Sequence, residues 1–200
     1  MKGSILILSI FIVGVLVGIG KIIPGSDYLN DISIYILYVL MFLVGISLGI
    51  DNHVWQQIRF MNFKILLVPI TTLLGTAIGI LLYQFFFKFP QGLDLYAIGA
   101  GFGYYSFSSI YICKVSGEQM GIIALLANII REVLTLVLAP ILVKYFGNLA
   151  PIAAGGATTS DTTLPIILKY SGKEYVLSSV INGVLLTILV PFLVAFIYNF

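Results

Sequence analysis

Three polar side chains interrupt an apolar stretch, residues 121–144, that is long enough to cross a lipid bilayer. Asn128, Arg131 and Glu132 lie near its middle, where a charge costs roughly 2.5–3.5 kcal/mol on insertion scales. Asn128 and Glu132 share one face of a helix because they are four residues apart, whereas Arg131 lies about 100° round from Glu132. Such groups must be buried in a bundle or wetted through a cavity. We therefore predict that this helix is the working centre of a transporter.

The two charged residues of this helix each allow two interpretations. An intramembrane carboxylate such as Glu132 can bind a substrate ammonium group, a coupling cation or a proton. Alternatively, it forms a structural ion pair with Arg131 or with Asp161. Arg131 in turn either neutralises a carboxylate of the bundle or binds the carboxylate of a substrate through its planar guanidinium group.

Asp161 is the second candidate, because a run of hydroxyl residues precedes it. Thr158, Thr159 and Ser160 stand directly before the aspartate. Hydroxyl groups, free backbone carbonyls and a carboxylate together suit a cation or an amine. A half-helix beginning near Thr162 would also direct backbone N–H groups at an anion. In the alternative interpretation, Asp161 only caps that half-helix.

The composition places all these groups in a membrane protein. Of the 200 residues, 60% are hydrophobic and only 9% are charged, against about 25% in a soluble domain, and the mean hydropathy is +1.12. A net charge of +2 without a basic patch argues against nucleic acid as a partner. One cysteine and one histidine argue against a metal site, and no cofactor is expected. We predict an all-α polytopic membrane helix bundle, a single transmembrane transporter domain over residues 1–200. Its seven hydrophobic segments are expected at residues 4–23, 32–50, 63–87, 95–113, 121–144, 149–168 and 175–198.

Two of these segments, 95–113 and 149–168, do not have the sequence of an ordinary spanning helix. Each combines glycines with hydroxyl residues, and the second also contains a proline. Such segments are expected to be broken or re-entrant and to line a substrate site, because unwound backbone at membrane depth is tolerated only inside protein or beside a cavity. The predicted unwound glycines are Gly101, Gly103, Gly155 and Gly156. Tyr104, Tyr105, Ser106 and Ser108 are expected to line the first segment, although the two tyrosines can equally be interface anchors.

A weak internal repeat links the two broken segments. The sequence KVSG at 114–117 recurs as KYSG at 169–172, and Asn128 matches Asn182 in the helix that follows. These asparagines either hydrogen-bond a substrate or bridge helices. Arg131 and Glu132 have no charged counterparts in the second copy. The scaffold therefore does not require the glutamate, which favours a role in binding or coupling.

The distribution of basic residues predicts the topology, and the absence of catalytic motifs limits the possible activities. If all seven segments cross, six lysine and arginine residues fall on the N-terminal side and three on the other, which predicts a cytoplasmic N-terminus and an external C-terminus. There is no P-loop, no G-x-S-x-G and no H-E-x-x-H motif, and only Asp161 is an aspartate clearly at membrane depth. We therefore predict that the chain is not an enzyme.

Three motifs, in order GFGYYSFSS, NIIREVLTLVLAP and GGATTSDTTLP, together with GISLGIDN, resemble the bacterial lysine exporter (LysO-type) family. The resemblance covers the whole chain, which is similar to the C-terminal two-thirds of the family's usual protein. It implies a secondary transporter that exports L-lysine, and toxic lysine analogues, through the inner membrane of a bacterial or archaeal cell. It also implies coupling to an ion or proton gradient by antiport, with Glu132 as the family's intramembrane glutamate.

Two alternatives to lysine export stay open from the residues. Buried acids and broken helices serve a cation/proton antiporter equally well. The chain would instead be a non-transporting subunit if it only completes the helix bundle of a partner. A small N-terminal chain of a split exporter, or a second copy of the same chain, is the partner that the resemblance implies.

Overall fold

The computed structural model describes residues 63–199 together with isolated positions between 13 and 50. The predicted segments 4–23 and 32–50 thus lie largely outside the described residues. The chain divides into two units, Met1–Val39 and Leu40–Phe200, and all the helices described below belong to the second.

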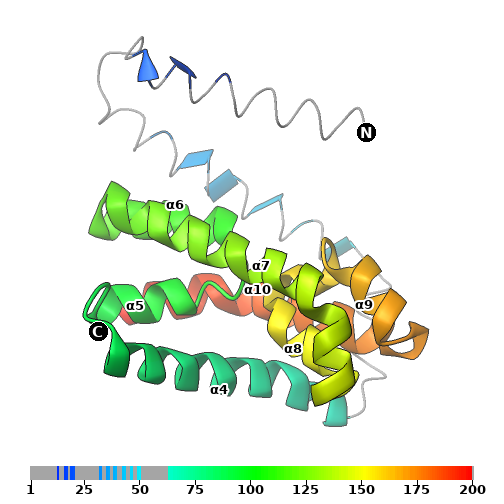
Figure 1. Ribbon diagram of the computed structural model, residues 1–200. Helices are drawn as coiled ribbons and strands as arrows, with labels where there is room; N and C mark the ends of the chain where they lie inside the picture. The colour runs from blue at the N-terminus through cyan, green and yellow to red at the C-terminus, as the bar shows by residue number, and fades with distance from the viewer. Residues whose placement is uncertain are drawn as a thin grey trace. The chain divides into compact units, whose positions relative to one another are not determined.

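Every regular element in residues 63–199 is helical, in agreement with the predicted fold class. Three helices are long: α4 (Phe63–Phe86), α7 (Glu118–Phe146) and α10 (Val176–Asn199). Between them lie four short α-helices and two short 3₁₀ turns (Figure 1). The short elements are α5 (Gly92–Gly99), α6 (Tyr105–Ser116), α8 (Ala150–Gly155), η1 (Gly156–Ser160), α9 (Leu164–Tyr170) and η2 (Lys173–Tyr175).

The long helices are of membrane-spanning length and composition. Ile65–Phe86, Glu118–Phe146 and Lys173–Asn199 have 22, 29 and 27 residues and are apolar enough to cross a bilayer. Large apolar side chains such as Leu74 and Val137 remain exposed on them, as expected of surfaces that face lipid. The predicted segments 63–87, 121–144 and 175–198 are confirmed as long helices within a few residues.

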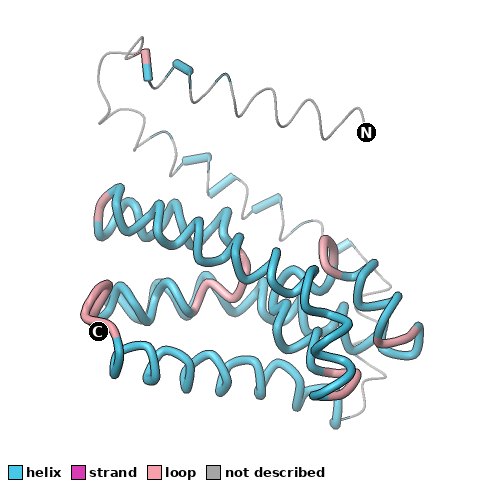
Figure 2. Tube along the Cα trace, in the orientation of Figure 1, coloured by secondary structure: helices cyan, strands magenta, loops and turns pink. Residues whose placement is uncertain are grey.

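The first broken segment folds back on itself. A loop separates α5 from α6 (Figure 2), with Phe102 at φ 44° and Gly103 at φ 92°. The start and the end of the segment meet, because the Ser116 hydroxyl donates a hydrogen bond to Asp94 Oδ1 at 2.5 Å. An unbroken helix of this length would hold these two residues about 33 Å apart at 1.5 Å per residue. We call residues 92–116 hairpin 1.

The second broken segment is built in the same way. α8 ends at Gly155, Gly156 has φ 67°, and the chain passes through η1 before α9 runs back. Ile152 of α8 and Ile167 of α9 are fully buried in one cluster with Val68 of α4. The Asn148 amide, just before α8, donates to the Tyr175 hydroxyl, just after α9, at 3.3 Å. We call residues 150–170 hairpin 2.

The two hairpins approach each other from opposite ends of the long helices (Figure 1). Their tips touch where the Ala157 N–H donates to the Phe102 carbonyl oxygen at 2.8 Å. Gly156 is required at this contact, because a Cβ atom there would collide with that same carbonyl oxygen. The four glycines predicted to be unwound, Gly101, Gly103, Gly155 and Gly156, all lie at the two breaks.

Candidate functional site

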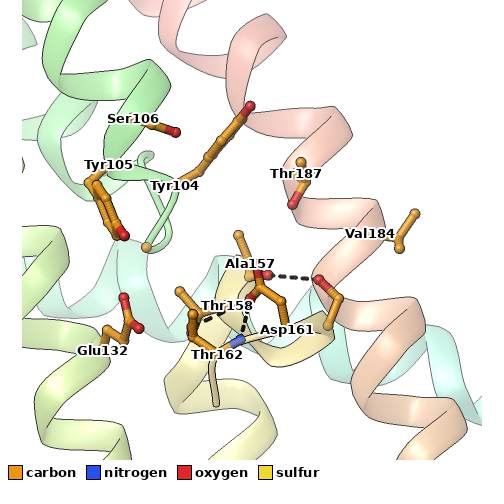
Figure 3. A pocket seen from close by; sticks show the side chains of 12 residues that line it. Tyr104, Tyr105, Ser106, Glu132, Ala157, Thr158, Asp161, Thr162, Val184 and Thr187 are labelled. Atoms are coloured by element: carbon orange, nitrogen blue, oxygen red, sulfur yellow. Dashed lines mark hydrogen bonds between the residues drawn. The ribbon is translucent and has the colours of Figure 1, made fainter. Parts of the chain in front are cut away.

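A cavity of about 280 Å³ lies where the hairpin tips meet the middle of α7 and α10 (Figure 3). Its volume is near the lower end of the roughly 300–1,000 Å³ typical of small-molecule pockets. Hairpin 1, hairpin 2 and both long helices contribute to its wall. The lining residues are Gly103, Tyr104, Tyr105, Ser106, Glu132, Ala157, Thr158, Ser160, Asp161, Thr162, Val184 and Thr187.

Two carboxylates reach this cavity from different elements. Glu132 comes from α7 and Asp161 from the link between η1 and α9 (Figure 3). None of the twelve lining residues, all within the described part of the chain, carries a basic side chain. The cavity wall is therefore acidic, and it suits a cationic solute.

The half-helix predicted near Thr162 is α9, which begins at Leu164. Thr163 occupies its cap position without a side-chain bond to the helix, so the alternative interpretation of Asp161 as the cap is wrong. Asp161 Oδ1 instead accepts a hydrogen bond from the Thr162 N–H at 2.6 Å. This bond engages one oxygen, and Thr162, like Asp161, lines the cavity.

Hydroxyl groups surround the two carboxylates. The structure places the predicted site residues Tyr105, Ser106, Thr158 and Ser160 in the cavity wall. Thr158 donates to the Gly155 carbonyl oxygen at 3.0 Å, which satisfies a carbonyl freed where the helix breaks. Hydroxyl groups at a helix break can serve both the freed backbone and a polar solute.

Five other predicted site residues lie outside the cavity wall and hold the hairpins instead. Asn128 accepts a hydrogen bond from the Gly103 N–H at 2.7 Å and donates to the Ile98 carbonyl oxygen at 3.4 Å. Thr159 donates to the Ser179 carbonyl oxygen at 2.8 Å and accepts from Asn182 at 3.2 Å. Ser108 is fully buried. The residues concerned are Asn128, Arg131, Ser108, Thr159 and Asn182.

Among the described residues Arg131 has no carboxylate partner, so the predicted structural ion pair with Glu132 or Asp161 is not formed. Its Nε donates to the Ala154 carbonyl oxygen at 2.8 Å and its Nη2 to that of Ala153 at 3.2 Å, while Nη1 donates to the Thr76 hydroxyl at 3.2 Å. These partners are carbonyl and hydroxyl oxygens, not carboxylates. The guanidinium group also lies over the Phe102 ring, 5.5 Å from its centroid. Arg131 therefore satisfies the exposed carbonyl end of α8 and bridges to hairpin 1.

Several lining residues were not predicted from the sequence as site residues. Thr187 and Val184 come from α10, which supplies one wall of the cavity, and Thr162 follows Asp161. A hydroxyl residue within the apolar sequence TILVP was the only signal for Thr187. Asp94, which binds Ser116 and accepts from the Tyr198 hydroxyl at 2.8 Å, was also overlooked.

Long apolar helices around a polar cavity, with broken helices at the cavity wall, define a multi-pass membrane protein of the transporter class. The comparisons with known proteins specify the family. The model of the lysine exporter LysO family matches residues 8–198. This chain therefore belongs to the lysine exporter LysO family, a family of transporters and not of enzymes.

Two relatives show how much of a family member this chain represents. It is 30% identical over 193 residues to the lysine exporter LysO of Escherichia coli strain K12, covering 96% of this chain and 63% of the relative. It is 34% identical over 173 residues to a putative lysine exporter of Haemophilus influenzae, covering 86% of each chain. The chain thus spans just under two-thirds of the first relative, whereas the second is close to it in length. No solved structure gave a significant match.

Proposed function

We propose that this chain carries L-lysine out of the cell through the inner membrane, in exchange for protons or another cation, and that the central cavity binds the amino acid. The single observation that carries the proposal is the pair of carboxylates, Glu132 and Asp161, which line one cavity without a basic residue among the described lining. Lysine brings two ammonium groups and one carboxylate, so two acidic side chains match its cationic ends.

The residues of the cavity can divide this work. Glu132 at the middle of α7 is half-buried, whereas Asp161 is exposed. Glu132 accepts either an ammonium group or a proton, which allows exchange between them. Asp161 keeps one oxygen available beside Thr162 for the second ammonium group. The hydroxyl groups of Ser106, Ser160 and Thr187 are the donors for the carboxylate of lysine. Arg131 is engaged by carbonyl groups outside this wall and is not needed for it.

Counterflow in proteoliposomes tests the proposal. Vesicles loaded with unlabelled lysine should accumulate external labelled lysine, and Glu132→Gln or Asp161→Asn should reduce the rate roughly ten- to a hundredfold, because a charged hydrogen bond contributes about 1.5–3 kcal/mol. Glu118→Gln and Glu174→Gln are matched controls, since both carboxylates are exposed and lie outside the cavity wall. Unchanged lysine counterflow in both cavity variants would refute the proposal. Counterflow driven by sodium or potassium but not by lysine would support a cation/proton antiporter instead.

The same assay decides whether a partner is needed. We propose transport by this chain alone or as a homo-oligomer, and the alternative arrangement includes an additional small membrane chain. Flux by the purified chain without any added protein supports the first arrangement. Flux that appears only with a small membrane partner supports the second.

A further inference from the structure

Asn128 and Asn182 make the same contact in two different parts of the structure. The Asn128 amide donates to the Ile98 carbonyl oxygen at 3.4 Å, and the Asn182 amide donates to that of Ile152 at 3.2 Å. Each acceptor lies 30 residues before its asparagine. Both pairs are therefore related by one shift along the chain, of 54 residues. In each case an asparagine on a long helix holds the first half of a hairpin near its break.

The same shift relates the first residue of each hairpin base, whereas the partner residues Ser116 and Tyr175 are 59 residues apart. Asp94 accepts a hydrogen bond from the Ser116 hydroxyl, and Asn148 donates one to the Tyr175 hydroxyl. Asp94 lies 54 residues before Asn148. Each of these bonds ties the start of a hairpin to its end. Figure 1 shows the two bases at opposite ends of the long helices.

The shift also relates the cavity walls. Hairpin 1 contributes residues 103–106, and hairpin 2 contributes the equivalent positions 157, 158 and 160. The tips touch through the Ala157 N–H and the Phe102 carbonyl oxygen. The cavity thus lies between two equivalent hairpin tips. The charges are not equivalent, because the position that matches Glu132 is the fully buried Leu186.

We propose that residues 92–146 and 150–199 are two structural repeats of opposite membrane orientation, and that Asn128 and Asn182 are equivalent positioning residues that hold the two cavity walls. Each repeat consists of a hairpin that returns to its own side and one helix that crosses. A repeat with one crossing reverses the orientation of the next repeat. The assignment of the hairpin tips as walls of a lysine site rests on the function proposed above. The inverted topology does not depend on that function.

The inverted arrangement leaves the charge bias unchanged. If the two segments before α4 cross, re-entrant hairpins move Lys114 to the side of Lys88 and Lys144 to the side of Lys169 and Lys173. The count stays at six basic residues against three, so the N-terminus again falls in the cytoplasm. The base of hairpin 1 is then external and that of hairpin 2 cytoplasmic.

Cysteine mapping tests the topology without measuring transport. The native thiol is removed by Cys113→Ser, and single cysteines replace the exposed residues Lys88, Glu118, Lys144 and Lys173. A membrane-impermeant maleimide should label positions 88 and 118 from one side and positions 144 and 173 from the other. Labelling of positions 88 and 144 from one side, and of positions 118 and 173 from the other, would mean that the broken segments cross the membrane. That grouping, or any other, would overturn the proposal even if lysine transport is confirmed.

Reactivity at the tips tests the positioning role. Asn128→Ala should raise the labelling rate of a Ser106→Cys probe severalfold from the hairpin 1 side, with little change at Ser160→Cys. Asn182→Ala should raise the labelling rate of the Ser160→Cys probe severalfold from the hairpin 2 side, with little change at Ser106→Cys. Asn199→Ala is the matched control, because its amide bonds only to the Ala195 carbonyl oxygen in the same helix.

A general loss of structure would raise the labelling rates of both probes by similar factors. The milder variants Asn128→Ser and Asn182→Ser, which keep a polar side chain, are therefore measured beside the alanine variants. Equal effects of each serine variant on both probes, or no effect on either, would overturn the positioning role. Such a result would leave the proposed lysine transport to be decided by counterflow.

Discussion

Arg131 donates a hydrogen bond to the carbonyl oxygen of Ala154 at 2.8 Å. The guanidinium group at the centre of α7 thus binds the end of a broken helix and not a carboxylate. The last carbonyl groups of any helix lack a partner within it. In α8, two residues of the last turn, Ala153 and Ala154, line a second cavity together with Arg131. A guanidinium group with several donors satisfies the carbonyl groups of both residues and still reaches Thr76 of α4.

Arg131→Gln should therefore lower the stability of the protein. Loss of hydrogen bonds from a charged donor costs about 1.5–3 kcal/mol, and the thermal unfolding temperature in detergent should fall accordingly. Lys144→Gln, at an exposed position of the same helix, is the control and should leave the unfolding temperature nearly unchanged. Should Arg131→Gln unfold at the wild-type temperature and yet abolish transport, the arginine acts on the solute and not on α8.

Gly101 should tolerate no side chain. A Cβ atom there would lie 2.6 Å from Asn128 Nδ2 and 2.8 Å from the Ser108 hydroxyl oxygen, so Gly101→Ala should displace the asparagine that holds hairpin 1. We expect a loss of about 1–3 kcal/mol in stability, as for other overpacked sites, together with reduced counterflow. Gly79→Ala on α4 is the control, because a Cβ atom there has no neighbour within 4 Å. It should be neutral or stabilise the helix by about 0.5–1 kcal/mol. Equal behaviour of the two variants would contradict the described contact.

Thr187 should affect binding more than folding. Thr187→Val preserves the shape of the side chain and removes a hydroxyl group from the cavity wall formed by α10. If that hydroxyl group binds the solute, the KM for lysine should rise roughly fivefold to tenfold, because a neutral hydrogen bond contributes about 1 kcal/mol. Thr71→Val is the control, since the Thr71 hydroxyl bonds to Val68 within α4. An unchanged KM would exclude Thr187 from the site.

The base of hairpin 1 should depend on the Tyr198 hydroxyl. It donates to Asp94 at 2.8 Å and lies 3.1 Å from the Ser116 hydroxyl oxygen, so α10 contacts both halves of the hairpin. Tyr198→Phe removes this hydroxyl group and should cost about 0.5–1.5 kcal/mol, measured by thermal unfolding. Tyr145→Phe, at an exposed position, should have little effect. Equal unfolding temperatures for Tyr198→Phe and the wild type would show that the Asp94–Ser116 bond holds the base alone.

The sequence by itself determined the membrane class, the long helices in the described region and the two breaks. These follow from local chemistry: apolar runs of spanning length, and glycine and hydroxyl residues that release or satisfy backbone groups wherever they occur. It also singled out Glu132 and Asp161, because a carboxylate within an apolar run is costly in any fold. The matched asparagines were visible as well, although not what they bind.

Only the tertiary structure decided which polar groups share a cavity. Glu132 and Arg131 are neighbours in sequence, yet one lines the cavity and the other binds α8, because adjacent residues of a helix point in directions about 100° apart. Thr187 and Asp161 are far apart in sequence and meet because hairpin 2 folds back against α10. Whether a broken segment returns or continues depends on contacts between its ends, such as Ser116 with Asp94, and no local pattern contains that information.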